Sequence, residues 1–261
     1  MKGVKAALIT GSILICIGII VVVAVGFSSG WNFAKTKWDS AVYESQLGTE
    51  ISAIDLEFSA GSLKVEFYDG DVIRVEYPES KRVTTEFKVT GQTLKISTVV
   101  HWHMQFLWFN KIPETKMFIP QNMQLKFNVE INAGAIELGT GAFDNISIEM
   151  NAGAINMGSV NCNTFDLKMS AGAVNVSQIV SNKFKADISA GALNVKGLQC
   201  DNIDLDLSAG SAKLGIVGKK SDYTILTDVS AGSCNVSSQT GGSKRLNIDV
   251  SAGSVNISFE E

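Results

Sequence analysis

The chain has 261 residues, of which 45% are hydrophobic and 18% are charged, and its formal net charge at pH 7 is −4. This composition can supply a sizeable buried core and excludes general disorder, because disordered chains contain few apolar residues. The slight acidic excess gives no basic surface that could neutralise phosphates, so we expect no nucleic-acid partner.

Residues 6–27 are uncharged and consist mainly of Ile, Val, Leu, Ala and Gly. Crossing a bilayer takes about 20 such residues, whereas the apolar part of a signal peptide usually has about 7 to 15. We therefore expect a cytoplasmic N-terminus at 1–5 and an uncleaved transmembrane helix, acting as a signal anchor, at 6–27. A signal peptide cleaved after Gly30 is the alternative.

The lysines on the two sides of this segment are nearly balanced in number and do not decide its orientation. A long domain can cross the membrane regardless of its charges, and the part that follows is long and rich in strand signals. The sequence thus predicts a single-pass protein of the cell membrane with its C-terminal domain outside the cell. Residues 28–49 are interpreted as a juxtamembrane linker, in which Trp31 and Trp38 are either interfacial anchors or ordinary linker residues.

Residues 50–123 are predicted to form irregular N-terminal β coils with an aromatic-rich insert. The short runs with strand character are 63–67, 72–77, 87–89, 94–96 and 117–119. The insert, residues 101–109, contains both histidines of the chain and two of its four tryptophans. Two histidines are a poor metal site, so we predict neither metal nor cofactor.

The aromatic side chains of the insert have two interpretations. They either cover the open end of the β structure or contact a membrane, a glycan or a protein partner. The candidate contact residues are Trp102, Phe106, Trp108 and Phe109.

A repeat fills residues 124–261. The tetrapeptide Ser/Asn-Ala-Gly-Ala/Ser begins at Asn132 and recurs four times at steps of 19 residues, then twice more after steps of 22 and 21. An eighth copy, Ser59-Ala-Gly-Ser62, stands upstream. Such a fixed period indicates a stack of similar structural units.

Within each unit, apolar residues stand one and five positions before the tetrapeptide, and a charged residue stands two positions before it. Apolar residues return at the fourth and sixth positions after its first residue. This spacing of two is typical of β-strands and not of helices. The inward parity changes across the Ala-Gly pair, so the chain must bend there, which glycine permits. The corner glycines are Gly134, Gly153, Gly172, Gly191, Gly210, Gly232 and Gly253.

The predicted fold is therefore all-β: a single-stranded, β-helix-like solenoid with coils of about 19 residues, preceded by one N-terminal transmembrane helix. Successive coils are expected to stack in register, with a looser third edge that carries Val160, Ile179 and Leu198. A β-sandwich is the alternative, although it would not require such identity between consecutive strand pairs.

Few residues suggest chemistry. Cys162 and Cys200 share a column two coils apart, about 9 to 10 Å, which exceeds the disulfide limit of about 7 Å, so we expect free thiols. The charged column could hold a divalent cation but is more often a solvated face, and we interpret the asparagine columns as structural. No catalytic motif is present, which predicts that the chain is not an enzyme.

The repeated Ser-Ala-Gly-x-(Val/Leu)-Asn-Val units behind an N-terminal membrane segment resemble the putative-adhesin family, a bacterial domain of unknown function. The stretches Thr93-Leu-Lys-Ile96 and Lys116-Met-Phe-Ile-Pro120 match the strand and Ile-Pro signature of that family, and the resemblance covers residues 50–258. It implies a surface-exposed β-solenoid, often linked with envelope-stress genes, and transfers no catalytic or binding residue.

We therefore expect a non-enzymatic cell-envelope protein that uses a β-solenoid for adhesion or binding. Its partner would be the membrane through the N-terminal helix, together with a glycan, the cell wall or a protein. A self-assembling scaffold and, less favoured, a carbohydrate-active β-helix enzyme are the alternatives.

Overall fold

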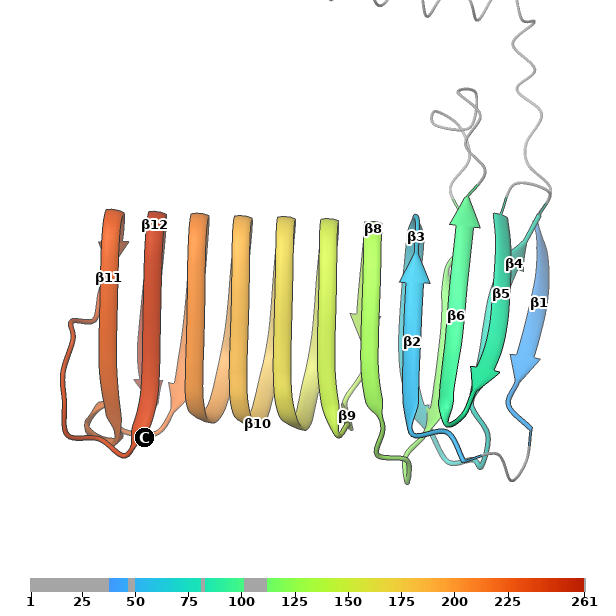
Figure 1. Ribbon diagram of the computed structural model, residues 1–261, viewed down its shortest axis with the longest axis horizontal. Helices are drawn as coiled ribbons and strands as arrows, with labels where there is room; N and C mark the ends of the chain where they lie inside the picture. The colour runs from blue at the N-terminus through green and yellow to red at the C-terminus, as the bar shows by residue number, and fades with distance from the viewer. Residues whose placement is uncertain (1–37, 47–49, 81–82, 101–111, 261) are drawn as a thin grey trace, which may run out of the picture. The chain divides into compact units, whose positions relative to one another are not determined.

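The computed structural model describes residues 38–46, 50–80, 83–100 and 112–260. These residues form twelve strands that belong to one sheet, and the sheet winds into a solenoid (Figure 1). Within these ranges there is no α-helix with the length and apolar character that a membrane span requires. The predicted transmembrane helix at 6–27 and the aromatic insert at 101–109 lie outside the described residues.

The strands run in chain order and are interrupted by one short 3-10 turn. They are β1 (Asp39–Glu44), β2 (Ala53–Phe58), β3 (Gly61–Tyr68), β4 (Arg74–Glu79), β5 (Val83–Thr90), β6 (Thr93–Val100), β7 (Thr115–Pro120), β8 (Lys126–Leu138), β9 (Gly141–Ala142), β10 (Asn145–Val217), η1 (Lys220–Asp222), β11 (Tyr223–Cys234) and β12 (Lys244–Glu260).

The inward and outward positions follow the predicted alternation. The apolar columns before and after the corners are buried, apart from Val229 and Cys234, which are partly exposed, and the third edge buries Val160, Ile179 and Leu198. At the corner itself the backbone of Gly153 has φ +144°, and a Cβ there would overlap the carbonyl oxygen of Gly134 in the preceding coil. Glycine thus permits both the bend and the close stacking of coils.

The register of 19 residues is confirmed from β8 to the end of β10. Residue pairs 19 apart hydrogen-bond from coil to coil, for example Asn151 Nδ2 to Asn132 Oδ1 at 2.7 Å and Thr164 Oγ1 to Asn145 Oδ1 at 2.6 Å. Inside, the rings of Phe165 and Phe184 stack with centroids 5.5 Å apart. Equivalent side chains therefore form continuous columns through the core.

The N-terminal end is more regular than predicted. β2 and β3 form one coil whose Ser59-Ala-Gly-Ser62 corner pairs directly with β8, with Gly61 opposite Gly134. β6 pairs with β2, and β7 pairs with β3, so these two strands form the next coil outward. Residues 101–111 join β6 to β7, in the chain position where other coils have the Ser-Ala-Gly corner.

Three antiparallel strands complete this end. β5 pairs with β6, β4 pairs with β7, and β1 pairs with β4. β1 lies in the segment that was interpreted as a linker, so that prediction is wrong for residues 39–44. Alternate residues of β1 are half-buried, and Tyr43 stacks on Phe87 at 4.2 Å, a contact that the lack of a repeat in this segment concealed.

The C-terminal end departs from the expected order. β12 pairs with the last coil of β10 on one side and with β11 on the other, so the final strand lies between two coils that precede it in the sequence (Figure 1). The expectation that the coils stack in sequence order is thus wrong for the last two. The longer steps of 22 and 21 residues are the sequence feature that accompanies this exchange.

The outer edge of β11 is covered in part by the loop 235–243. Ile225 and Gln239 exchange backbone hydrogen bonds of 2.8 and 2.9 Å, and the Thr227 amide donates to Ser238 Oγ at 3.0 Å. The loop therefore occupies part of an edge that could otherwise pair with another strand.

Candidate binding surface

The two outer faces of the solenoid differ in charge. The outward residues of the first strand of each coil, two positions before the corner, are all charged. They are Glu57, Glu130, Glu149, Lys168, Asp187, Asp206, Asp249 and Asp228 in spatial order. On the second strand, the outward residues of three consecutive coils are Asn156, Asn175 and Asn194. One face is therefore predominantly acidic, whereas the centre of the other is neutral and polar.

The three asparagines form a row along the solenoid. Asn156 and Asn175 are exposed, Asn194 is half-buried, and Asn175 Nδ2 donates to Asn156 Oδ1 at 3.3 Å. Buried Ile155, Val174 and Leu193 precede them and hold the strand in place. The row thus stands on a rigid part of the fold.

A hollow of about 710 Å³ lies beside this row. Its lining includes Gly139, Gly158 and Ser177, which occupy the next outward position of three consecutive coils, and their small size accounts for the hollow. We call this hollow, with the asparagine row, the asparagine groove.

The ends of the groove are charged. At one end Lys64 Nζ lies 2.8 Å from Glu66 Oε1, and a hydrogen bond with Glu66, followed by the charges of Glu66 and Glu137, raises the pKa of the lysine. At the other end Lys196 lines the hollow. The paired charges of Lys64 and Glu66 leave the middle of the groove to uncharged amide and backbone groups.

The acidic face contains a run of four aspartates, Asp187, Asp206, Asp249 and Asp228, on neighbouring coils. Partial burial raises the pKa of Asp206, and the charges of Asp187 and Asp249 raise it further, while Lys185 opposes the shift. Among the residues that the structure describes, no group of three or more histidine, cysteine or acidic residues has the arrangement of a metal site.

The buried thiols are poorly suited to nucleophilic chemistry. Burial, with a smaller contribution from Cys200, raises the pKa of the Cys162 thiol to about 12, and burial also raises the pKa of Cys200. Both thiols are free, and Ser181 between them donates to Cys200 Sγ at 3.5 Å. Since the thiolate is the reactive form, these cysteines serve packing.

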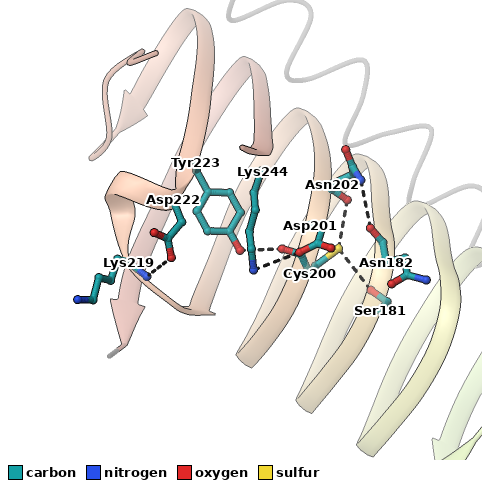
Figure 2. Close-up of polar contacts among 9 residues, drawn as sticks. All are labelled: Ser181, Asn182, Cys200, Asp201, Asn202, Lys219, Asp222, Tyr223 and Lys244. Atoms are coloured by element: carbon teal, nitrogen blue, oxygen red, sulfur yellow. Dashed lines mark hydrogen bonds and ion pairs between the residues drawn. The ribbon is translucent and has the colours of Figure 1, made fainter. Parts of the chain in front are cut away.

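A polar cluster near the C-terminal end has a structural role (Figure 2). The hydroxyl of the buried Tyr223 donates to the Cys200 carbonyl at 2.7 Å, and burial is the main cause that raises the tyrosine pKa to about 12. Lys244 lies 3.1 Å from Asp201 and 5.7 Å from the centre of the Tyr223 ring. The cluster links β11, the intervening β12 and the last coil of β10.

The residues predicted as a site are distributed as follows. Trp102, Phe106, Trp108 and Phe109 lie outside the described residues. The seven corner glycines all have positive φ values, between 118° and 151°. Sequence reasoning noted the asparagine column but interpreted it as structural, and it missed Gly139 and Gly158. Their recurrence seven positions after the start of the corner was the available signal.

The fold can now be set beside known proteins. A family model described as Toastrack DUF4097 matches residues 51–261, which is most of the chain. The chain belongs to the Toastrack DUF4097 family. A comparison with curated proteins finds none that matches.

Several solved structures are similar to this Toastrack chain. A putative cell adhesion protein from Clostridium sporogenes is 15% identical, covers 86% of this chain and 100% of its own, and has a TM-score of 0.39. A putative adhesin from Bacteroides fragilis is 9% identical, covers 85% and 97%, and has a TM-score of 0.40. One from Parabacteroides merdae is 10% identical, with coverage of 86% and 97% and a TM-score of 0.38.

Proposed function

We propose that the chain is a non-enzymatic module of the cell envelope that binds a glycan, cell-wall or protein partner through the outside of its solenoid. The observation that carries this proposal is the asparagine groove, an open polar hollow on rigid, stacked strands. Binding groups on strands are held more precisely than groups on loops, so such a surface suits recognition.

Hydrolysis of a carbohydrate is less well supported. A glycosidase uses two carboxyl groups on either side of the scissile bond. In the described part of the groove the carboxyl groups are Glu66, which is paired with Lys64, and Glu137. The run of aspartates lies on the first strands, away from the asparagine row.

Assembly into a scaffold is also less well supported. Stacking between molecules needs open strand edges at both ends of the solenoid. At the C-terminal end, Ser238 and Gln239 already hydrogen-bond to β11. The covered edge favours a module that works as one copy.

We further propose that residues 6–27 anchor the module, with its C-terminal domain outside the cell, and that it serves alongside envelope-stress functions. β1 begins and β6 ends at the same edge of the solenoid (Figure 1). The chain therefore leaves toward the anchor and enters residues 101–111 at one edge. This supports Trp102, Phe106, Trp108 and Phe109 as a contact surface near the anchor.

The test is co-sedimentation of the full chain, in a detergent without a sugar head group, with purified cell-wall sacculi. We expect saturable binding without release of soluble sugar, and a single sedimenting species in the absence of sacculi. Concentration-dependent filaments would instead support the scaffold, and release of soluble sugar would support the enzyme. Absence of binding to sacculi, membranes and envelope proteins would contradict the proposal.

A further inference from the structure

The residue types in the asparagine groove are unusual for the outside of a strand. Asparagine and glycine are both depleted in strands, because they pack poorly on a pleated surface. Here Asn156, Asn175 and Asn194 hold one outward column, and Gly139 and Gly158 begin the next. The equivalent columns on the first strands have charged residues, which give solubility without this cost.

The coil geometry accounts for the corner glycines but not for Gly158. Gly153 has a positive φ, and the neighbouring backbone occupies the place of a Cβ. Gly158 is not among the glycines with positive φ, and the nearest atom to a Cβ there would be the tip of the Thr140 side chain, Oγ1, at 2.8 Å. A strand glycine that the fold does not require often marks a place where a ligand approaches the backbone.

We propose that the asparagine groove binds a neutral carbohydrate chain that lies across consecutive coils. This deepens, and rests on, the proposed binding function. An asparagine amide can donate and accept hydrogen bonds, as a sugar hydroxyl can, so a row of amides matches a row of hydroxyls. The bond between Asn175 and Asn156 uses one donor and one acceptor and leaves both amides further capacity.

The size and charge of the groove agree with this ligand class. Its volume of about 710 Å³ lies within the usual range for small-ligand sites, about 300 to 1,000 Å³. Gly139 and Gly158 leave space for a sugar ring against the backbone. Because Lys64 is paired with Glu66, the groove lacks the concentrated positive charge that an anionic polymer would require.

The experiment titrates the full chain, in a detergent without a sugar head group, with cellotetraose, maltotetraose and tetra-N-acetylchitotetraose. Binding is measured by calorimetry and by the side-chain amide signals in NMR spectra. We expect saturable binding of at least one tetrasaccharide, with shifts at Asn156, Asn175 and Asn194. Failure of all three to bind would overturn the inference, as would shifts confined to other residues.

Two pairs of variants locate the site. Ser177→Arg places a long side chain in the groove, whereas Ser147→Arg makes the same change at an exposed serine on the other face. Asn156→Ala with Asn175→Ala removes two groove amides, whereas Asn163→Ala with Asn182→Ala removes two stacked amides elsewhere. We expect Ser177→Arg to abolish binding, and the groove double variant to weaken it by roughly 10- to 100-fold, or about 3- to 10-fold per amide.

Equal losses in the groove and control variants would contradict the site. If wild-type protein binds sacculi but none of the tetrasaccharides, this inference fails while the proposed function stands. If it binds no envelope component either, the proposed function fails as well.

Discussion

The coils of β10 and the final pair, β11 and β12, have the same repeat but relate sequence to space differently. In β10 each corner lies on the corner 19 residues before it, as Gly172 lies on Gly153. In the final pair, Gly253 lies on Gly210, and Gly232 lies on Gly253. The repeat therefore determines which side chains face inward, but it does not determine which coils are neighbours.

The connections explain this difference. A 19-residue step is just long enough to circle the core and rise by one strand spacing, about 4.8 Å. The step to β11 is longer and includes η1, so the chain can rise by two spacings and leave a gap. β12 then fills the gap, and Lys244 is held there between Tyr223 and Asp201.

The sharpest way to break this comparison is to cross-link the outward serines of the last corners. Ser211 is opposite Ser254, whereas Ser211 and Ser233 are two coils apart. We expect Ser211→Cys with Ser254→Cys to form a disulfide almost completely, because neighbouring strands are about 4.8 Å apart and a disulfide spans about 4.4 to 6.8 Å. Ser211→Cys with Ser233→Cys should form none within the molecule. Peptide mapping of the oxidised protein reads both, and the opposite result would restore sequence order.

A second test concerns the stacking of the regular coils. Gly153→Ala places a Cβ where the neighbouring carbonyl lies, on a backbone with φ +144°, so we expect a loss of about 3 kcal/mol or more in the free energy of unfolding. The matched change is Gly197→Ala, where the nearest atom would be 3.6 Å away. That variant should lose less than about 0.5 kcal/mol. Urea denaturation measures both, and similar losses would show that the corner is not a close contact.

The sequence was sufficient to predict the parts that depend on side-chain periodicity. Columns such as Phe127, Ile146 and Phe165 could be assigned to the core because alternation places them on one face. The neighbours of β12 could not be predicted, since Val229 and Val250 are equivalent in the repeat and either coil could stand on β10. β1 was missed because six residues without a repeat do not reveal their partner.

The candidate site was predictable only in part. The asparagine column was visible, but its exposure depends on which way the chain bends at the corner, which the sequence leaves open. Gly139 and Gly158 were visible as well, yet only the built backbone separates a glycine that the fold requires from one that it does not.

A smaller effect tests what holds β12 in its gap. Tyr223→Phe removes the bond to the Cys200 carbonyl, which is buried, so we expect a loss of about 1 to 2 kcal/mol in the free energy of unfolding. The control is Tyr68→Phe, whose hydroxyl bonds the nearby Val72 carbonyl in a partly exposed turn. Water can replace that bond, so the loss should be smaller. Hydrogen exchange should rise in β11 and β12 for the first variant only, and an unchanged rate there would exclude this role of Tyr223.

The smallest expected effect is electrostatic and uses the order of the aspartates. The raised pKa of Asp206 means that, as the pH rises above the ordinary value of 3.8, the unfolded chain releases its proton before the folded chain does. Deprotonation therefore favours unfolding, and this stability is lost as the pH passes through the folded-state pKa. Asp206→Asn should remove the penalty and stabilise the protein at pH 7 by about a few tenths of a kcal/mol, since the group is solvent-exposed, with no gain near pH 3.

The control for this variant is Glu149→Gln, because Glu149 lies between Glu130 and Lys168, where one neighbour repels it and the other attracts it. A double-mutant cycle then relates the effect to the coil order. Asp249 is the direct neighbour of Asp206, and Asp228 is one coil further away. The coupling of Asp206 with Asp249 in urea denaturation should therefore exceed its coupling with Asp228, and both should shrink in high salt. A larger coupling with Asp228 would place β11, and not β12, against the last coil of β10.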